Sequence, residues 1–66
     1  MNGIEIEGEQ LVRIGKRNFA LAVFIRAEDW DCDGFYDGAR GYTFLRGKRI
    51  PVRYVFDGNY FTADGG

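Results

Sequence analysis

Alternating carboxylates in one short stretch are the residues of this sequence whose spacing could do chemistry. Asp29, Asp31, Asp33 and Asp37 fall within nine residues, and Gly34 stands among them. Carboxylate oxygens are the ligands that Ca²⁺ takes in proteins, and a glycine permits the sharp turn that brings alternate side chains round one ion. The stretch therefore predicts a candidate cation-binding loop with these four aspartates as metal ligands.

The order of these residues resembles the opening of a calcium-binding loop of the EF-hand or thrombospondin-repeat kind. Acids at positions one, three, five and nine and a glycine at position six match over residues 29–37. Position twelve, where a bidentate acid closes the coordination sphere, is Arg40, and an aromatic strand pattern follows in place of an exiting helix. The resemblance thus implies a weak Ca²⁺ site, and the alternative is a solvated acidic loop made of ordinary turn residues.

Two further side chains of this loop, Trp30 and Cys32, share one side of the chain if it is extended. We expect Trp30 to pin the loop onto the core rather than to meet a ligand. Cys32 is the only cysteine, so the chain can form no internal disulfide. A single thiol fits a reducing compartment, and we expect a cytoplasmic protein.

A second chemistry is carried by aromatic and arginine residues that alternate along the C-terminal part of the chain. Aromatic rings stack on bases while guanidinium groups meet phosphates, and the same residue types dominate the hot spots of protein interfaces. The expected partner-binding residues are Tyr42, Phe44, Arg46, Arg49, Arg53 and Tyr60. A protein partner is the first hypothesis and single-stranded nucleic acid the alternative. A third interpretation is that other strands cover this face.

The charge balance favours the protein partner. Nine Lys plus Arg against ten Asp plus Glu give a formal net charge of -1. Sequence-independent affinity for nucleic acid grows with the number of phosphates that a protein neutralises. The acidic residues 28–37 would oppose an approaching polyanion if they lie near the arginines.

Two hairpins are expected to position the aromatic and arginine residues. Asp57-Gly58 stands between alternating apolar runs and predicts a type I′ turn, because both positions of that turn need a positive φ. This turn sets Val55 opposite Tyr60. A turn at residues 47–48 closes the preceding hairpin.

The turn at residues 47–48 sets Leu45 opposite Ile50. Side chains alternate along a strand, so the two hairpins sort their residues into two faces. The expected inner face consists of Thr43, Leu45, Ile50, Val52, Tyr54, Phe56, Phe61 and Ala63. The expected partner-binding residues fall on the other face.

The N-terminal part is expected to form another hairpin. A three-residue loop at residues 8–10 sets Ile4 against Ile14 and Ile6 against Val12, which gathers the apolar residues on one side. A two-residue turn at residues 8–9 would split them between the faces. We therefore prefer the longer loop.

The middle of the chain is expected to hold one more strand and a long loop. After a turn at residues 15–18, residues 19–25 are apolar on both faces and predict a central strand. A buried helix through Asp29 is the rival, because Ala and Leu are good helix formers. Residues 27–41, rich in Gly and Asp, predict a long loop that can hold a short helix.

The predicted fold class is all-β: a small antiparallel meander of about six strands that curls into a sheet or small barrel. We expect a single domain over residues 1–66, with residues 64–66 as a flexible tail. A chain of this length buries only about 60% of its unfolded surface, which leaves a homodimer open as a way to enlarge the core.

Several functions are disfavoured by what the sequence lacks. It has no His and no Ser, which removes Ser-His and Cys-His nucleophile pairs and the common zinc sets. No apolar run is long enough to span a bilayer, and no basic stretch precedes a hydrophobic one as in a signal peptide. We expect a non-enzymatic binding module with no cofactor other than the Ca²⁺ considered above. Its size suggests a small regulator or inhibitor of the kind carried by phages and mobile elements.

Overall fold

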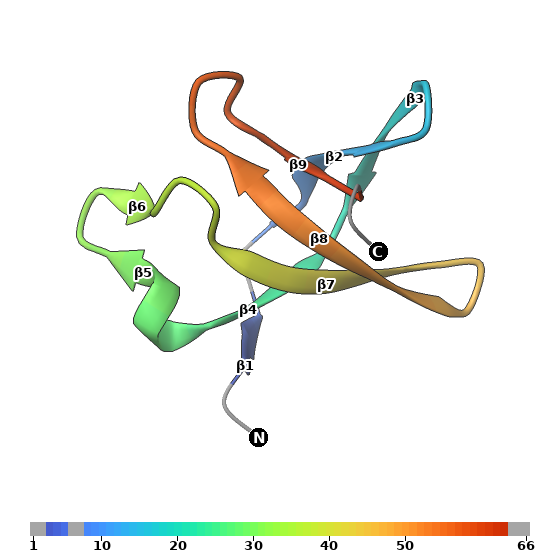
Figure 1. The fold of residues 1–66 in the computed structure, drawn as a ribbon. Helices are drawn as coiled ribbons and strands as arrows, with labels where there is room; N and C mark the ends of the chain where they lie inside the picture. Colours follow the sequence, from blue (N-terminus) through green and yellow to red (C-terminus); the bar gives the residue numbers. More distant parts are fainter. Residues whose placement is uncertain (1–2, 6–7, 64–66) are drawn as a thin grey trace.

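The computed structural model describes residues 3–5 and 8–63. The expected tail at residues 64–66 and residues 6–7 of the expected first hairpin lie outside the described residues. Short strands and one 3-10 turn follow one another along the described chain (Figure 1). They are β1 (Gly3–Glu5), β2 (Gln10–Ile14), β3 (Arg17–Leu21), β4 (Val23–Arg26), η1 (Ala27–Asp29), β5 (Trp30–Asp31), β6 (Gly34–Phe35), β7 (Arg40–Leu45), β8 (Lys48–Val55) and β9 (Tyr60–Thr62).

Seven of these strands form one curled sheet in the order β1-β4-β7-β8-β9-β2-β3, and β5 pairs with β6 alone. The prediction of an all-β fold with a curled sheet is confirmed. The sheet is mixed rather than a pure meander, because β2 pairs with β9 in parallel through Val12 and Phe61. The amide of Ala63 extends this contact by donating to the carbonyl oxygen of Arg13 at 2.9 Å.

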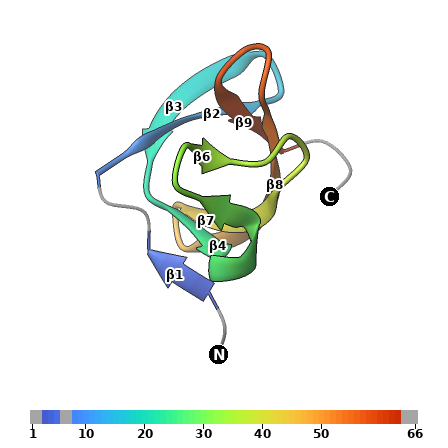
Figure 2. The ribbon, with the colours of Figure 1, turned by 90° about the vertical axis from the view of Figure 1, so that its left-hand side faces the viewer.

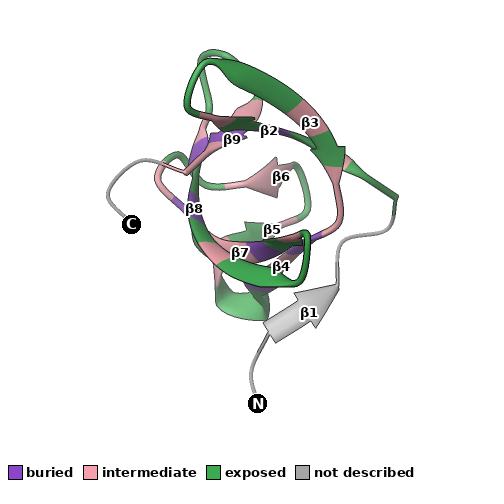
Figure 3. Ribbon diagram, turned by 90° about the vertical axis from the view of Figure 1, so that its right-hand side faces the viewer, coloured by how far each residue is buried: buried purple, intermediate pink, exposed green. Residues whose placement is uncertain are grey.

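The curl follows from the connection between β3 and β4. In a flat sheet of this order β3 and β4 would lie five strand spacings apart, about 24 Å. Only Ala22 separates Leu21, the last residue of β3, from Val23, the first residue of β4, and such a link spans at most about 7 Å. The sheet must therefore bend round on itself, as the views along the opening show (Figures 2 and 3).

Residues 19–25 thus form two strands that share one run of alternating side chains. Val23 and Ile25 are buried, and Phe19 and Leu21 are half-buried on the same side. The rival helix does not form, since the only helical turn in the described chain is η1, which begins after β4. The other face of this run is not buried to the same extent, since Ala20 is exposed and Phe24 half-buried, and β3 lies at the edge of the sheet.

The hairpin between β7 and β8 differs from the prediction in its turn. Arg46 and Gly47 occupy the turn, with φ values of 54° and 80°, as a type I′ turn requires. Leu45 therefore pairs with Lys48, rather than with Ile50 as predicted. The error in register is two residues, so every side chain keeps its predicted face.

The hairpin between β8 and β9 has the predicted register, with Val55 opposite Tyr60. Its turn is not type I′, because Asn59 has the positive φ of 56° and Gly58 does not. The hydroxyl of Tyr54 donates to Asn59 Oδ1 and holds this conformation. Phe56 therefore lies in the turn and is exposed, which corrects its assignment to the inner face.

The predicted N-terminal hairpin, in which Ile4 pairs with Ile14, is wrong. β1 pairs with β4, where Ile4 lies opposite Ile25. β2 pairs instead with β3 across a two-residue turn, with Ile14 opposite Arg17. Gly15, with a φ of 65°, permits this tighter turn, which is shorter than the predicted turn over residues 15–18. In a curled sheet, strands that follow one another in sequence can belong to opposite edges, and local alternation does not report this.

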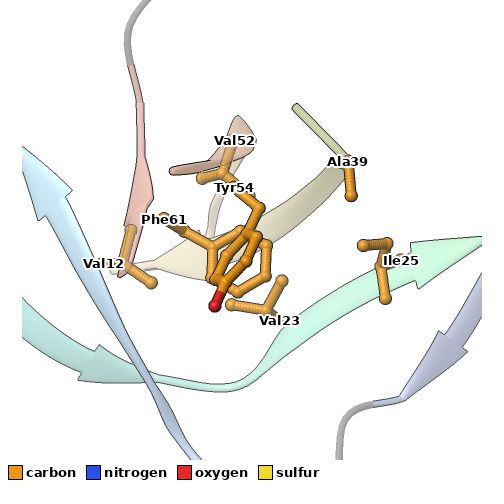
Figure 4. Packing of buried hydrophobic residues seen from close by; sticks show 7 residues of the cluster. All are labelled: Val12, Val23, Ile25, Ala39, Val52, Tyr54 and Phe61. Carbon is orange, nitrogen blue, oxygen red and sulfur yellow. The ribbon is translucent and has the colours of Figure 1, made fainter. Parts of the chain in front are cut away.

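The core lies inside the curl and draws on strands from all parts of the sheet (Figure 4). Of the predicted inner face, Thr43, Val52, Tyr54 and Phe61 are buried, and Leu45, Ile50 and Ala63 are half-buried. The buried hydrophobic residues that form this core are Val12, Val23, Ile25, Ala39, Val52, Tyr54 and Phe61.

The middle excursion, defined as residues 27–39, supplies part of this core. It crosses the opening of the curled sheet, where β6 is seen within the ring of strands (Figures 2 and 3). The ring of Phe35 packs on Tyr54 and Phe61 at centroid distances of 5.3 and 5.2 Å. Phe35 therefore fastens the excursion to the core. Trp30 packs edge-on against Phe35 at 4.6 Å and is 45% exposed, so its contact with the core is indirect, which corrects the expectation that Trp30 itself pins the loop. No helix in the described part of the chain is long and apolar enough to cross a membrane.

Candidate binding surface on the outer face of the sheet

Strand register places three aromatic side chains side by side on the outside of the sheet. Tyr42 on β7 lies opposite Phe24 on β4 and Pro51 on β8. Phe44, two residues further along β7, lies opposite Arg49. The intervening Thr43 is buried, so its neighbours in sequence point outward.

These side chains contact one another. The rings of Phe24 and Tyr42 stack at a centroid distance of 5.2 Å, and Phe44 meets them edge-on at 6.1 and 5.7 Å. The guanidinium carbon of Arg49 lies 4.3 Å from the centre of the Tyr42 ring, a cation–π contact. We call Phe24, Tyr42, Phe44 and Arg49 the aromatic stripe. Phe44 is 48% exposed, while Phe24 and Tyr42 are half-buried.

Three of the four residues of the aromatic stripe, Tyr42, Phe44 and Arg49, belong to the most basic part of the chain. Residues 40–56 carry five basic side chains and no acidic one, namely Arg40, Arg46, Lys48, Arg49 and Arg53. All five are exposed. Arg40 and Arg53 lie directly opposite each other, so two like charges sit beside the stripe on the same face. This surface favours an anionic group on whatever approaches it.

Of the predicted partner-binding residues, Tyr42, Phe44 and Arg49 come together, and Tyr60 does not join them. Tyr60 pairs with Val55, which is six residues from Arg49 along β8, about 20 Å. Its ring instead lies under Arg13, whose guanidinium carbon is 4.5 Å from the ring centre. Arg46 lies in the turn beside the stripe and Arg53 beyond its other end.

The two acidic side chains at the start of the excursion, Glu28 and Asp29, form ion pairs with Arg26. Arg26 Nε lies 3.0 Å from Asp29 Oδ2, and its Nη1 lies 3.1 Å from Glu28 Oε1. The hydrogen bond that Arg26 donates to Asp29 raises the pKa of Arg26, and the charges of Asp29 and Glu28 act in the same direction. Asp29 thus serves as a counterion, and an exposed pair of this kind contributes little to stability.

The other predicted metal ligands make separate backbone contacts. Asp31 Oδ1 accepts a hydrogen bond from the amide of Asp33 at 2.8 Å. Asp37 Oδ1 accepts one from the amide of Phe56 at 3.1 Å, which ties the excursion to the β8–β9 turn. Within residues 3–5 and 8–63, no three His, Cys, Asp or Glu side chains gather as a metal-binding group. The structure therefore does not bring Asp29, Asp31, Asp33 and Asp37 together.

Two residues of the outer face, Phe24 and Arg13, were not among the predicted binding residues. Phe24 belongs to the stripe, and its position among buried Val23 and Ile25 indicated an outward side chain. What the sequence did not reveal is that β4 pairs with β7, which puts Phe24 beside Tyr42. Arg13, which stacks on Tyr60, could not be found without the parallel pairing of β2 and β9.

The chemistry of the stripe is that of a contact surface. Exposed rings gain free energy when a partner covers them, and guanidinium groups make directional hydrogen bonds to carboxylates. Comparison of the chain with protein-family models, curated proteins and solved structures gives no match. The function therefore has to be inferred from the geometry of this surface.

Proposed function

We propose that this protein is a small non-enzymatic binding module, a regulator or inhibitor that docks its aromatic stripe onto an apolar, carboxylate-bearing surface of another protein. One observation carries the proposal. Phe24, Tyr42 and Phe44 pack against one another on the outside of the sheet, and Arg49 lies over Tyr42. The core lies on the opposite side of these strands. The packing of the core therefore does not explain why these rings are clustered on the outside.

Mutual packing prepares the stripe for binding. Ordering a free side chain at an interface costs about 0.5–1.5 kcal/mol, and a ring already held by its neighbours avoids part of that cost. Arg49 is placed in the same way by its contact with Tyr42. Aromatic and arginine side chains at the centre of a contact are the residues that most often act as hot spots.

The basic residues around the stripe define the partner. Arg40, Arg46 and Arg53 border the rings and would pair with acidic groups on the rim of the partner surface. Complementary rim charges accelerate association and make it sensitive to salt. The mechanism is steric, since the module acts by occupying a surface. A reducing compartment such as the cytoplasm suits it, because Cys32 is an exposed free thiol.

Single-stranded nucleic acid is the alternative occupant of the same stripe. Base stacking needs open ring faces, and those of Tyr42 already contact Phe24 and Arg49. The net charge of -1 also provides little general attraction for a polyanion. An oligothymidine titration separates the two hypotheses. Binding that weakens steeply with added salt and is lost in Phe44→Ala would support nucleic acid.

Affinity capture with a matched control tests the proposal. The test variant is Phe44→Ala with Arg49→Glu, and the control is Leu11→Ala with Arg17→Glu. Leu11 is 46% exposed and Phe44 is 48% exposed, so both variants remove one exposed apolar side chain and reverse one exposed arginine. We expect at least one host protein that the wild type and the control retain and the test variant loses. Identical profiles for all three proteins would reject the stripe as the binding surface.

A further inference from the structure

Strand β3 has one edge that pairs with no other strand in residues 3–5 and 8–63. It is the last strand of the sheet, and β2 is its neighbour there. Ile14 and Arg17 close a two-residue turn, so they exchange both of their backbone hydrogen bonds, and such pairs alternate with non-bonded pairs along the hairpin. The amide and carbonyl groups of Asn18 and Ala20 therefore point away from β2, and both residues are exposed.

The unpaired edge of β3 faces the side on which β7 lies. The carbonyl oxygen of Ala22 accepts a hydrogen bond from the hydroxyl of Thr43 on β7. Backbone groups two residues apart in an extended chain point the same way, so the carbonyls of Asn18 and Ala20 share this side. The ladder between β4 and β7 ends at Val23 and Thr43. Beyond it the strands diverge, with β3 at the top of the ring of strands and β7 at the bottom (Figure 3).

Residues 18–21 of β3 carry none of the features that protect a sheet edge. Such edges are commonly blunted by proline, by a bulge or by an inward-pointing charge. Residues 18–21 contain no proline and no charged side chain, and their register with β2 is regular. Phe19 and Leu21 point inward but are only half-buried, whereas Val23 and Ile25 of the same run are buried. The edge therefore offers backbone hydrogen bonds beside apolar side chains that water still reaches.

We propose that an extended peptide segment of a partner protein, with apolar and acidic side chains in alternation, adds to the unpaired edge of β3 as a further strand. Backbone hydrogen bonds to Asn18 and Ala20 hold such a segment. Its side chains alternate between the two faces of the sheet. Continued past Thr43, the β4–β7 register would set Leu21 opposite Leu45, and both are half-buried on the inner face. The inward side chains of the added strand are therefore apolar.

The outward side chains of the added strand are acidic because its surroundings are basic. The same continued register would set Ala20 opposite Arg46, which is exposed. All nine basic residues of the chain lie in residues 10–26 and 40–56, and none of the ten acidic residues does. These two ranges contain the whole of β2, β3, β4, β7 and β8. The strands around the edge thus attract carboxylates whichever face a particular side chain occupies.

The edge site goes beyond the proposed function and does not depend on it. The aromatic stripe binds through side chains on β4, β7 and β8, whereas the edge binds through backbone groups of β3. A substitution that removes a ring of the stripe leaves the amides of Asn18 and Ala20 unchanged. The two sites can therefore fail separately.

A synthetic peptide of alternating valine and glutamate tests the edge site by amide NMR. Titrated into the isotope-labelled protein at low salt, it should shift the signals of Asn18 and Ala20 in a saturable way. At saturation the hydrogen exchange of these two amides should slow by at least about tenfold. The same peptide with every amide N-methylated keeps its side chains and charge but cannot donate a backbone hydrogen bond, so it should not bind. A valine–lysine peptide should not bind either.

A proline at position 20 blocks the edge without breaking the β2–β3 ladder. Proline is tolerated in an edge strand where the amide it removes faces solvent, so we expect Ala20→Pro to fold. It should bind the valine–glutamate peptide at least about tenfold more weakly, because one hydrogen bond is lost and the ring obstructs the added strand. Ala20→Thr keeps the amide and is the matched control. Ala20→Thr and Phe44→Ala, the latter in the stripe, should bind as the wild type does.

Three results would overturn the proposal. The first is a titration that leaves the amides of Asn18 and Ala20 unshifted or unprotected in the wild type, a result that does not depend on how Ala20→Pro folds. The second is equal binding of the N-methylated peptide, because side chains and charge alone would then hold it. The third is self-association of the free protein, seen by sedimentation velocity, that Ala20→Pro abolishes. In that case a second copy of this chain would be the occupant of the edge.

Discussion

Replacing Thr43 with Val tests how the curled sheet is closed. Thr43 is fully buried, and its hydroxyl donates to the carbonyl oxygen of Ala22 at 2.5 Å. Ala22 is the single residue between β3 and β4 and belongs to neither ladder. The hydroxyl of Thr43 thus takes the place of a missing sheet hydrogen bond where the chain passes from one edge of the sheet toward the other.

The cost of this change can be worked from the contact. Valine keeps the shape of Thr43 and removes the donor, and a carbonyl left without its partner in the interior costs about 1–3 kcal/mol. The whole domain of 66 residues is expected to be stable by about 3–10 kcal/mol. Thr43→Ser keeps the hydroxyl and loses one methyl group, which costs about 1 kcal/mol. We therefore expect the serine variant to be the more stable of the two, although it is the smaller side chain.

Urea denaturation followed by far-UV circular dichroism measures both variants. The expected order of unfolding free energy is wild type, Thr43→Ser, Thr43→Val, with unchanged urea dependence. A valine variant as stable as the wild type would refute the reasoning, because hydrophobic filling alone would then account for position 43.

The same measurement checks three further changes. Gly41→Ala should cost about 1–3 kcal/mol, because a Cβ at Gly41 would overlap the carbonyl oxygen of Phe24 on β4; a neutral effect would mean that the two strands lie further apart. Gly47→Ala should destabilise by about 1 kcal/mol, since the φ of Gly47 is 80°, and Gly47→Asn should cost less; equal losses would argue against the type I′ turn. Asp37→Ala should cost about 1 kcal/mol by removing the acceptor of the Phe56 amide, whereas Asp37→Asn retains it and should match the wild type.

Local alternation predicted the core-facing side chains of β7, β8 and β9, and it failed at Phe56, which lies in the turn. Thr43, Val52, Tyr54 and Phe61 are buried as predicted, although the turn between β7 and β8 lies at Arg46 and Gly47. A register error of two residues leaves the faces unchanged, since side chains alternate with a period of two. For the same reason the aromatic and arginine residues of β7 and β8 reached the outer face as predicted.

The pairing of strands that are far apart in the sequence could not be predicted from local alternation. The pairing of β1 with β4 and of β2 with β9 follows from the closure of the sheet, and no turn signal marks either. The site changed accordingly. Phe24 joined Tyr42 through the pairing of β4 with β7, while Tyr60 joined Arg13 at a separate place.

The alternating aspartates and the turn glycine of residues 29–37 indicated less about the structure than the alternating apolar residues of the strands did. Asp and Gly also make ordinary turns, and here Asp31 and Asp37 each accept a backbone hydrogen bond. An aromatic side chain does hold this region to the core, but it is Phe35, which packs on Tyr54 and Phe61, and not the predicted Trp30.

Site-specific photo-crosslinking tests the aromatic stripe most directly. A benzoylphenylalanine residue is placed at Phe44, and in a matched protein at Leu11, which is exposed to a similar extent on β2. Irradiation in host cells is predicted to join one partner protein to the chain labelled at position 44 and not to the chain labelled at position 11. An adduct that forms equally at both positions, or at neither, would contradict the account.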